Sequence, residues 1–402
     1  MPEQSNILIC VFSIIFGYLI GSFLPAYFIG KCKNIDIRQV GTKNPGSINS
    51  YKTLGLLPTI PVVMYDCLKG VIAILVAKGI GANFVCAQLA GIAAILGHVF
   101  PFYLKFRGGQ GVAAAIGVII YYLIMCIRAD VNFLYIIGFL LIIFVLFYYV
   151  TKCGVLTRLI VFPVLCYAAF AQNPGFEYNY WLLIVIVHTQ IIAIINTVKF
   201  KLIHIEDETF KSHWWRVALR PCAVIFVILY LYWPQRMLLV FVGSVALVFI
   251  LIDVIRFILR QANELLTIRI NNFLKKGESR RFSSMTMFLV AAFIIVLVFK
   301  QDIAMAALTF LIFGDIFSKI FGLAFGRNKL FDKTVEGSVA YLGGVLICGY
   351  ILYTGLHMPI LMLTAGAIAA TLAEFVPLGI DDNFTVGIVS GAVMTVVRTF
   401  GT

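Results

Sequence analysis

Charged residues are scarce in this chain of 402 residues. Asp, Glu, Lys and Arg make up only 12% of it, against about 25% in an average soluble domain. Hydrophobic residues make up 62%, and the mean hydropathy is +1.01. This composition excludes a soluble globular protein, a disordered chain and a nucleic-acid binder with a basic face. The apolar runs are long and continuous rather than alternating, which predicts an all-α polytopic integral membrane protein and not an outer-membrane barrel.

Ordered cysteine patterns are missing as well. None of the nine cysteines belongs to a CxxC pair, so the sequence gives no sign of a disulfide framework or a zinc site. The N-terminal stretch lacks a basic region and a small-residue cleavage site, so we expect a first membrane helix there rather than a cleaved signal peptide. Most of the cysteines lie inside apolar runs, where small buried hydrophobic side chains are expected; these are Cys10, Cys86, Cys126, Cys166, Cys222 and Cys348.

Fourteen segments are long and apolar enough for membrane helices of about 20 residues. With the N-terminus outside, 25 of the 31 Lys and Arg residues fall on the inner side, which explains the net charge of +13 without a nucleic-acid partner. The polar segment 199–216 separates two modules of seven helices, which predicts domains at residues 1–205 and 206–402. The predicted helices start near Asn6, Leu54, Asn83, Gly111, Val131, Gly154, Tyr180, Val217, Met237, Ser284, Ile303, Ser338, His357 and Phe384.

A segment rich in small and polar residues surrounds Arg38 on the predicted inner face. Glycines between residues 41 and 46 let the backbone approach an anion, and Arg38 can bind a phosphate through two parallel hydrogen bonds. A plain turn between helices explains the same residues equally well. Further along the chain, Asp66 and Lys69 are spaced to pair on one helix face. They form either a self-neutralised structural pair or a lysine directed at a substrate phosphate.

A second glycine-rich segment, 97–117, lies on the same predicted side. It places His98, Lys105 and Arg107 before glycines that open a helix of small residues, and the N-terminus of such a helix is an anion site. Taken singly, His98 is explained as a hydrogen-bonded core residue, and Lys105 and Arg107 as ordinary inner-loop charges. Their convergence with Arg38 instead favours a site where a soluble anionic substrate meets a membrane lipid.

Four segments together resemble the motifs of the PlsY acyl-phosphate:glycerol-3-phosphate acyltransferases. They are GSFLPAYFIG, NIDIRQVGTKNPGSIN, DCLKG and GHVFPFYLKFRGGQGV, and the resemblance covers about residues 10–200. It implies seven spans with a cytoplasmic site in the cell inner membrane. It also implies acyl transfer from acyl phosphate to glycerol 3-phosphate, giving lysophosphatidic acid without acyl-CoA or a cofactor. By this resemblance the catalytic residues are His98, Arg38 and Lys105. The substrate-binding residues would be Ser22, Thr42, Asn44, Asn49, Lys69, Arg107, Gly108, Gly109 and Gly111.

Two features depart from that family. Gln110 stands in GGQGV where the family usually has lysine, and the third motif is blurred around Asn196, Lys199 and Glu206. An inactive first half is therefore one alternative. The predicted inner face offers no Ser-His-Asp or Cys-His arrangement, and acyl phosphate is already activated. Positioning and charge neutralisation of two phosphates can then supply much of the catalysis, with either His98 or the substrate phosphate accepting the proton.

Carboxylates and lysines also gather on the predicted inner face of the second module. Asp315 lies among apolar neighbours, where an ionisable residue usually has a function. Carboxylates of this kind can hold Mg²⁺ together with nucleotide phosphates. Helix caps and loop solvation are the alternative, above all for Asp381–Asn383.

This half resembles the CTP-dependent lipid kinases that act on dolichol, phytol or diacylglycerol. The matching stretches are Glu278–Ser283, Gly314–Arg327, Lys333–Ser338 and Glu374–Asn383. The resemblance implies that Asp315 is catalytic and that Asp315 and Asp382 bind Mg²⁺. It also implies CTP binding by Lys333, Glu336, Glu374 and Asp382. A cytidylyltransferase that makes a CDP-lipid is the alternative.

Together these observations predict a two-module enzyme of phospholipid synthesis. Its partners would be acyl phosphate, glycerol 3-phosphate and membrane lipids, with no nucleic acid, and the sequence does not indicate an oligomeric state. A transporter of an anionic solute is the competing class. Transporters usually carry interrupted helices and charged groups at the bilayer midplane, in halves that are inverted copies. Here the polar groups cluster at the inner boundary and the halves do not resemble each other.

Overall fold

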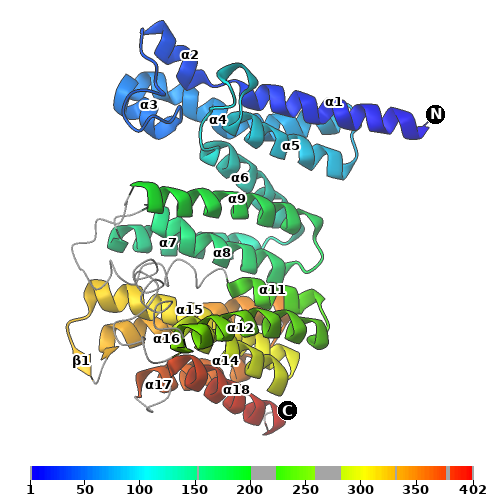
Figure 1. Ribbon diagram of the computed structural model, residues 1–402. Helices are drawn as coiled ribbons and strands as arrows, with labels where there is room; N and C mark the ends of the chain where they lie inside the picture. The colour runs from blue at the N-terminus through cyan, green and yellow to red at the C-terminus, as the bar shows by residue number, and fades with distance from the viewer. Residues whose placement is uncertain are drawn as a thin grey trace. The chain divides into compact units, whose positions relative to one another are not determined.

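The computed structural model describes residues 2–151, 154–200, 223–258, 282–330, 333–376 and 381–400. Over these ranges the chain is almost entirely helical (Figure 1), and the sheet found there is a short antiparallel hairpin of β1 (Lys329–Leu330) and β2 (Lys333–Thr334). The chain divides into two compact units. Unit 1 comprises residues 1–131 and 176–196, and unit 2 comprises residues 132–175 and 197–402.

Unit 1 contains the first long apolar helices, with two short helices between the first and the second of them. Its elements are α1 (Pro2–Ser22), α2 (Pro25–Cys32), α3 (Ser47–Leu54), α4 (Leu56–Gly79), α5 (Phe84–Val99), the 3₁₀ turn η1 (Phe102–Leu104), α6 (Val112–Ala129) and α9 (Glu177–Phe200). Local chemistry sets the boundaries. Pro25 occupies the first turn of α2, where its missing N–H costs nothing. Gly55 separates α3 from α4 with φ +88°. The Asn83 side chain caps α5 by accepting from the Cys86 N–H.

Glycines bring α1 and α5 into close contact. A Cβ on Gly17 would lie 2.2 Å from the Ala90 carbonyl oxygen, and one on Gly21 would lie 2.1 Å from that of Ala94. On the other helix, a Cβ on Gly97 would meet the backbone of α1 at 2.3 Å. Small residues at such a contact let two membrane helices approach backbone to backbone.

A disulfide joins the same two helices between Cys10 and Cys86. The expectation that both are merely small buried hydrophobic residues was therefore wrong. The two cysteines are 76 residues apart, so no local spacing could reveal the pair. It forms because the glycine contact of α1 and α5 sets their Cα atoms 5.2 Å apart, a separation that a disulfide can bridge. Cys126, Cys166 and Cys348 are buried, as expected.

Unit 2 is built around α15 (Gln301–Phe325), of whose span 89% is buried. It packs against α16 (Val335–Leu356) and α18 (Asp382–Phe400). The other helices are α7 (Phe133–Thr151), α8 (Gly154–Gln172), α11 (Val224–Tyr232), α12 (Gln235–Ile258), α14 (Ser284–Val298) and α17 (Ile360–Phe375). The units do not follow the sequence division at residues 205 and 206, because α7 and α8 lie in unit 2.

Nine helices within the described ranges are long and apolar enough to cross a membrane. Four further apolar helices, α7, α8, α14 and α17, have 10–17 residues in the stretches whose side chains the structure describes, and α11 has nine. A described helix lies at each of the fourteen predicted segments, but the count of fourteen spans and their orientation stay predictions. Residues 201–216 of the polar segment and the predicted start at Val217 lie outside the described residues.

Candidate functional site

Arg38 lies in the loop between α2 and α3, held by a neighbouring carboxylate. Its Nε and Nη2 donate to the two oxygens of Asp36 at 3.1 and 3.0 Å. The guanidinium also stacks on the Tyr27 ring, 4.8 Å from its centroid. These hydrogen bonds lower the pKa of Asp36 and raise the pKa of Arg38 from their ordinary values, so both groups are charged at neutral pH. The arginine is therefore a fixed cation.

Asn49 shapes the loop that carries Arg38. The Asn49 side chain is buried and accepts from the Thr42 N–H at 2.8 Å. Its amide group donates to the carbonyl oxygens of Ile37 and Val40 at 2.8 and 3.0 Å. These bonds satisfy the amide within the protein and fix the backbone on both sides of Arg38. Direct substrate contact by Asn49 and Thr42 stays a prediction.

A tyrosine connects this loop to the second glycine-rich segment. Tyr103 in η1 donates to the Ser22 carbonyl oxygen at 2.8 Å. Its ring lies 6.5 Å from that of Tyr27, on which Arg38 stacks. The Ser22 hydroxyl itself donates back to Tyr18 within α1. Asn44 is half-buried in the first loop, and its carbonyl oxygen accepts from the Gly46 N–H. Both predicted loops are thus at the same end of unit 1.

A buried polar triad lies in the helices beneath these loops. Lys69 is fully buried, and its Nζ lies 2.8 Å from Asp66 Oδ1 and 2.5 Å from His98 Nδ1. His98 Nδ1 is in turn 3.4 Å from the same carboxylate oxygen. Lys69 thus pairs with Asp66, as one sequence alternative expects, and it also contacts His98, whereas a lysine directed at a substrate phosphate stays a prediction. Because these side chains are buried, each charge depends on its partner.

The Gly108–Gly111 loop is folded onto the end of α5. The N–H groups of Gly108 and Gly109 donate to the carbonyl oxygens of Val99 and His98. Gly111 has φ +71° and precedes α6, so only glycine adopts this conformation without strain. The helix N-terminus that follows is where an anion would be favoured.

We expect Gly109→Ala to distort this loop. An alanine Cβ would lie 2.1 Å from His98 Nε2, and overpacking of this kind costs about 1–3 kcal/mol. Thermal unfolding in detergent would measure the loss. Gly79→Ala is the matched control, because nothing lies within 4 Å of its added Cβ. Equal unfolding temperatures for the two variants would contradict the contact.

Gln110 and Asn196 form a reciprocal amide pair. Gln110 Nε2 donates to Asn196 Oδ1 at 2.7 Å, and Asn196 Nδ2 donates to Gln110 Oε1 at 2.9 Å. On the same helix, His188 Nε2 lies 3.2 Å from the position of a Cβ on Gly111. The blurred third motif therefore does reach the glycine loop through Asn196. The Lys199 side chain and Glu206 lie outside the described residues.

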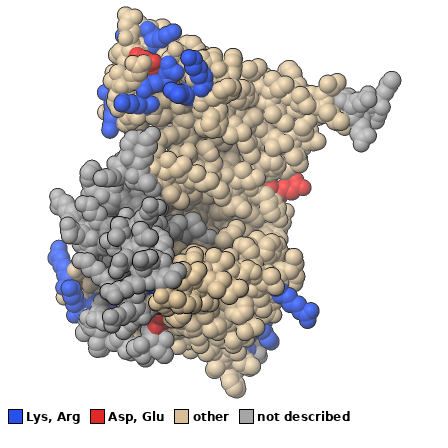
Figure 2. Space-filling view, in the orientation of Figure 1, with Lys and Arg blue, Asp and Glu red and all other residues tan. Residues whose placement is uncertain are grey.

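Exposed lysine and arginine side chains lie at the end of unit 1 that carries the two glycine-rich segments. Lys105 and Arg107 are exposed on the loop before the glycines. Figure 2 shows the Lys and Arg side chains gathered over α2 and α3. The exposed lysines of that segment are Lys31, Lys33, Lys43 and Lys52. Unit 1 therefore places a paired arginine and several exposed cations at the end that carries the glycine loop, an arrangement that can bind and orient phosphates.

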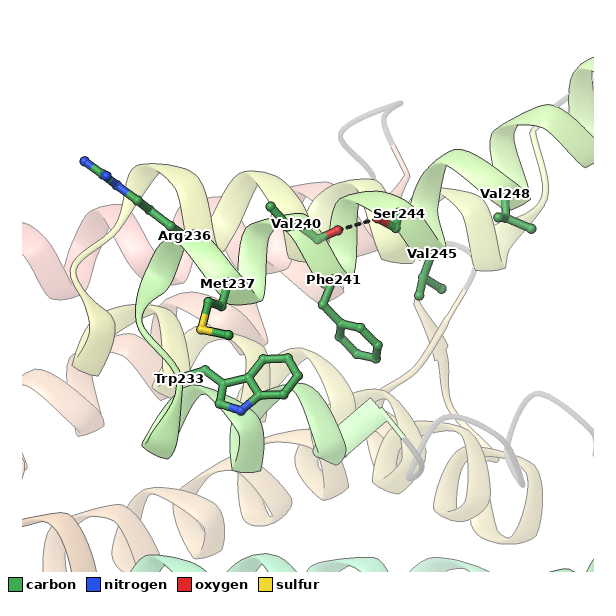
Figure 3. A pocket seen from close by; sticks show the side chains of 8 residues that line it. All are labelled: Trp233, Arg236, Met237, Val240, Phe241, Ser244, Val245 and Val248. Carbon is green, nitrogen blue, oxygen red and sulfur yellow. Dashed lines mark hydrogen bonds between the residues drawn. The ribbon is translucent and has the colours of Figure 1, made fainter.

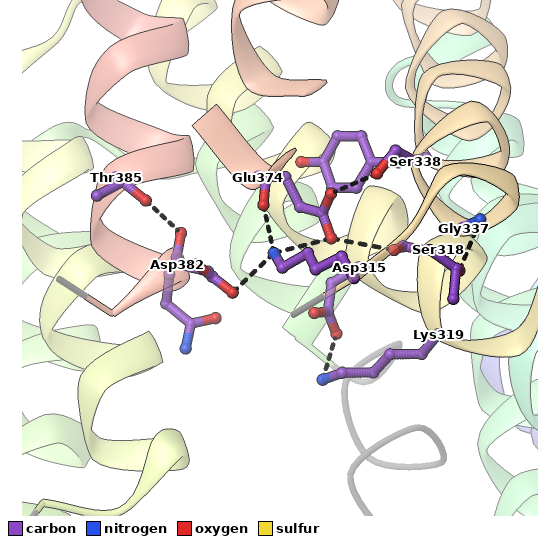
Figure 4. Close-up of polar contacts among 12 residues, drawn as sticks. Asp315, Ser318, Lys319, Gly337, Ser338, Glu374, Asp382 and Thr385 are labelled. Atoms are coloured by element: carbon purple, nitrogen blue, oxygen red, sulfur yellow. Dashed lines mark hydrogen bonds and ion pairs between the residues drawn. The ribbon is translucent and has the colours of Figure 1, made fainter. Parts of the chain in front are cut away.

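A second polar cluster, in unit 2, centres on Lys333. Its Nζ lies 3.0 Å from Glu374 Oε1 and 2.9 Å from Asp382 Oδ2. Ser318 donates to Glu374 at 3.0 Å, and Ser338 donates to it at 3.4 Å (Figure 4). Glu374 is buried. Three motif segments, which contain Ser318, Lys333 with Ser338, and Glu374 with Asp382, thus meet around Lys333 and Glu374.

The remaining predicted residues of unit 2 have other partners. Asp315 lies 2.8 Å from Lys319 one helical turn later (Figure 4). The Glu336 carboxylate accepts from the N–H and side-chain amide of Asn328. Among the described residues, no group of three or more His, Cys, Asp or Glu side chains is arranged to hold a metal. Glu278 lies outside those residues.

An open groove of about 630 Å³ follows α12, away from these polar residues. Figure 3 shows its lining, chiefly Trp233, Met237, Val240, Phe241, Val245 and Val248. Apart from Arg236 and Ser244 the lining is apolar. Such a surface suits contact with lipid chains and offers no groups for chemistry.

Sequence reasoning missed several polar residues of both units. Tyr103 and His188 lack a signal of their own, since single aromatic or histidine residues in apolar runs usually belong to the core. Asp253 and Arg256 had a usable signal, because they repeat the i,i+3 spacing of Asp66 and Lys69. Both are buried, and Asp253 accepts from the Ser283 N–H at 2.8 Å.

These features define a helical membrane protein whose first unit carries a cationic, glycine-lined site. Residues 11–201 match the family model "Glycerol-3-phosphate acyltransferase". The chain is 40% identical over 112 residues to glycerol-3-phosphate acyltransferase 1 of Deinococcus radiodurans, covering 28% of this chain and 57% of that protein. It is 46% identical over 110 residues to the glycerol-3-phosphate acyltransferase of Thermoanaerobacter sp., covering 27% and 55%. The chain thus spans about half the length of these curated relatives.

A solved structure is similar over the same extent. It is the crystal structure of PlsY, an integral membrane glycerol 3-phosphate acyltransferase, in its glycerol 3-phosphate form. It shares 26% sequence identity, covers 48% of this chain and 94% of its own chain, and superimposes with a TM-score of 0.39. The similarity of residues 11–201 to the glycerol-3-phosphate acyltransferases rests on the family model.

Proposed function

We propose that the first half of this protein transfers an acyl group from acyl phosphate to glycerol 3-phosphate and so makes lysophosphatidic acid. One observation carries the proposal: the family match over residues 11–201 contains the motif residues that meet at one end of unit 1. Arg38 is fixed there by Asp36, and His98 is joined to Lys69 and to the glycine loop.

The reaction needs two phosphates held close together and little else. The hydroxyl of glycerol 3-phosphate attacks the carbonyl carbon of acyl phosphate, the bond to the phosphate oxygen breaks, and inorganic phosphate leaves. Arg38, Lys105 and Arg107 would neutralise the phosphate charges, and the first amides of α6 would bind phosphate oxygens. The proton can pass directly to the departing phosphate. The burial of His98, with Nδ1 facing Lys69, favours this route over a histidine base.

The same proposal includes a location. A multi-pass protein of the inner membrane with this site on the cytoplasmic side would meet soluble glycerol 3-phosphate and a lipid-like acyl donor together. The lysines around α2 and α3 support that orientation, since cytoplasmic loops carry an excess of Lys and Arg.

An assay on the purified protein tests the proposal. Acyl phosphate and glycerol 3-phosphate are added in detergent, and lysophosphatidic acid and released phosphate are measured. We expect both products in equal amounts, and neither when glycerol 3-phosphate is omitted or acyl-CoA replaces acyl phosphate. Activity only after Gln110→Lys would mean that the natural first half is impaired. Absence of product from both proteins would refute the acyltransferase.

For the second half we propose a CTP-dependent lipid kinase, supported by the meeting of three motif segments at Lys333. The proposal requires Mg²⁺, but the described carboxylates do not form a metal site, and Lys333 pairs with two of them. When CTP binds, Lys333 would contact a phosphate of the nucleotide in place of its carboxylate partners.

We expect Lys333→Met to abolish phosphorylation of a lipid alcohol by CTP. Dolichol, phytol and diacylglycerol would be offered with CTP and Mg²⁺, and CDP release would be measured. Pyrophosphate release with phosphatidate would instead indicate a cytidylyltransferase. Uptake of an anionic solute into liposomes, without either reaction, would favour the transporter.

A further inference from the structure

Gln110 provides the side chain by which the glycine loop, residues 108–111, can be held in place, and this side chain pairs with Asn196. Gln110 is the only residue between positions 108 and 111 that has one. On the α5 side, the loop is held by backbone hydrogen bonds to Val99 and His98. On the α9 side, it is held by two hydrogen bonds between amides, at 2.7 and 2.9 Å.

The Gln110–Asn196 pair is well suited to holding the glycine loop in place, and it is poorly suited to binding a phosphate. Both amides are neutral, and each uses a donor and an acceptor on the other. Asn196 is only 8% exposed, so breaking the pair would leave a buried amide without its partner, which is costly. About two helical turns earlier along α9, the His188 side chain lies beside Gly111, where an added Cβ would be 3.2 Å from Nε2. The α9 helix therefore follows the loop at two places.

We propose that Gln110 and Asn196 are a positioning pair, which sets the N-terminus of α6 for the phosphate without contacting substrate. α6 has no side-chain cap, and it begins directly after Gly111. Its first N–H groups consequently depend on the loop for their direction. The neutral hydrogen bonds between Gln110 and Asn196 of α9 take the place of a lysine charge directed at the substrate. Arg38, Lys105 and Arg107 supply the positive charges.

Kinetics of four variants test the pair. Gln110→Ala and Asn196→Ala should each lower kcat by on the order of tenfold or more, because small displacements of positioned groups are expensive. The double alanine variant should be no worse than either single one, since the two residues act as a unit. Gln110→Asn combined with Asn196→Gln keeps both amides and their summed length, and should recover most of the activity. Asn83→Ala, which removes the cap at the far end of α5, should leave kcat unchanged.

A direct phosphate contact would give a different pattern. Gln110→Ala would then raise KM for acyl phosphate, Asn196→Ala would have little effect on kcat, and the two effects would multiply. Failure of the exchanged pair to recover activity would equally overturn the proposal, provided that its unfolding temperature equals that of the wild-type protein.

The kinetic test of the positioning pair rests on the proposed acyltransferase activity. Hydrogen exchange tests the pair without that activity. Deuterium uptake over residues 109–117 should rise in Gln110→Ala and in Asn196→Ala, and should return to the wild-type level in the exchanged pair. Asn83→Ala should leave uptake in this segment unchanged. This test holds even if the protein shows no acyltransferase activity. Unchanged uptake in both alanine variants would show that the pair does not hold the loop.

Discussion

Replacing Arg38 by alanine should reduce the formation of lysophosphatidic acid by about 100- to 1,000-fold. Loss of one preorganised donor to developing charge has an effect of this size, and Arg38 is held in place in the loop between α2 and α3. Two hydrogen bonds to Asp36 and the Tyr27 ring hold it. The rate of product formation by the purified variant, at saturating acyl phosphate, measures the loss.

Two further variants sharpen this prediction. Arg128→Ala changes the arginine in the last turn of α6, at the opposite end of that helix from the glycine loop, and should leave the rate unchanged. Asp36→Asn keeps Arg38 but weakens its support, so its rate should lie between those of the wild-type protein and Arg38→Ala. Full activity of Arg38→Ala would remove Arg38 from the site.

Replacing Lys69 by methionine should destabilise unit 1 by about 3–5 kcal/mol. Removal of one partner from a buried ion pair leaves the other charge without compensation, and Asp66 is only 1% exposed. Unfolding can be followed by far-ultraviolet circular dichroism of the purified protein in detergent. The unfolding temperature should fall strongly.

The paired variant gives the control for this effect. Asp66→Asn together with Lys69→Met removes both charges and should recover much of the stability, because neither charge is then stranded. If Lys69→Met alone unfolds at the wild-type temperature, water must reach the pair, and the buried triad is not closed.

The positions of the helices could be predicted from the sequence because they depend on local properties. Long apolar runs, Pro25, Gly55 and Asn83 mark their limits without reference to the rest of the chain. The i,i+3 pair of Asp66 and Lys69 could likewise be found, since both residues lie on one helix.

Contacts between distant helices could not be predicted in the same way. Asn196 reaches Gln110 only because α9 follows the loop before α6, and no spacing encodes that arrangement. The neighbours of Asn49 also required the structure. Its residue type suits both substrate and backbone, and only the folded loop shows that its amide is used by the backbone. In unit 2, Lys333 contacts Glu374 and Asp382. The order of these segments in the sequence does not predict that contact.

The bond between Cys10 and Cys86 has a consequence for the two sides of the membrane. Each cysteine lies 12 residues before the residue at the site end of its helix, Ser22 in α1 and His98 in α5, which is about 18 Å along a helix axis. Disulfides persist in oxidising compartments and are rare where thioredoxin and glutathione keep thiols reduced. The disulfide therefore agrees with the orientation proposed from the lysines, in which the half of α1 and α5 that carries the bond would face the oxidising side and the proposed phosphate-binding end would face the reducing one.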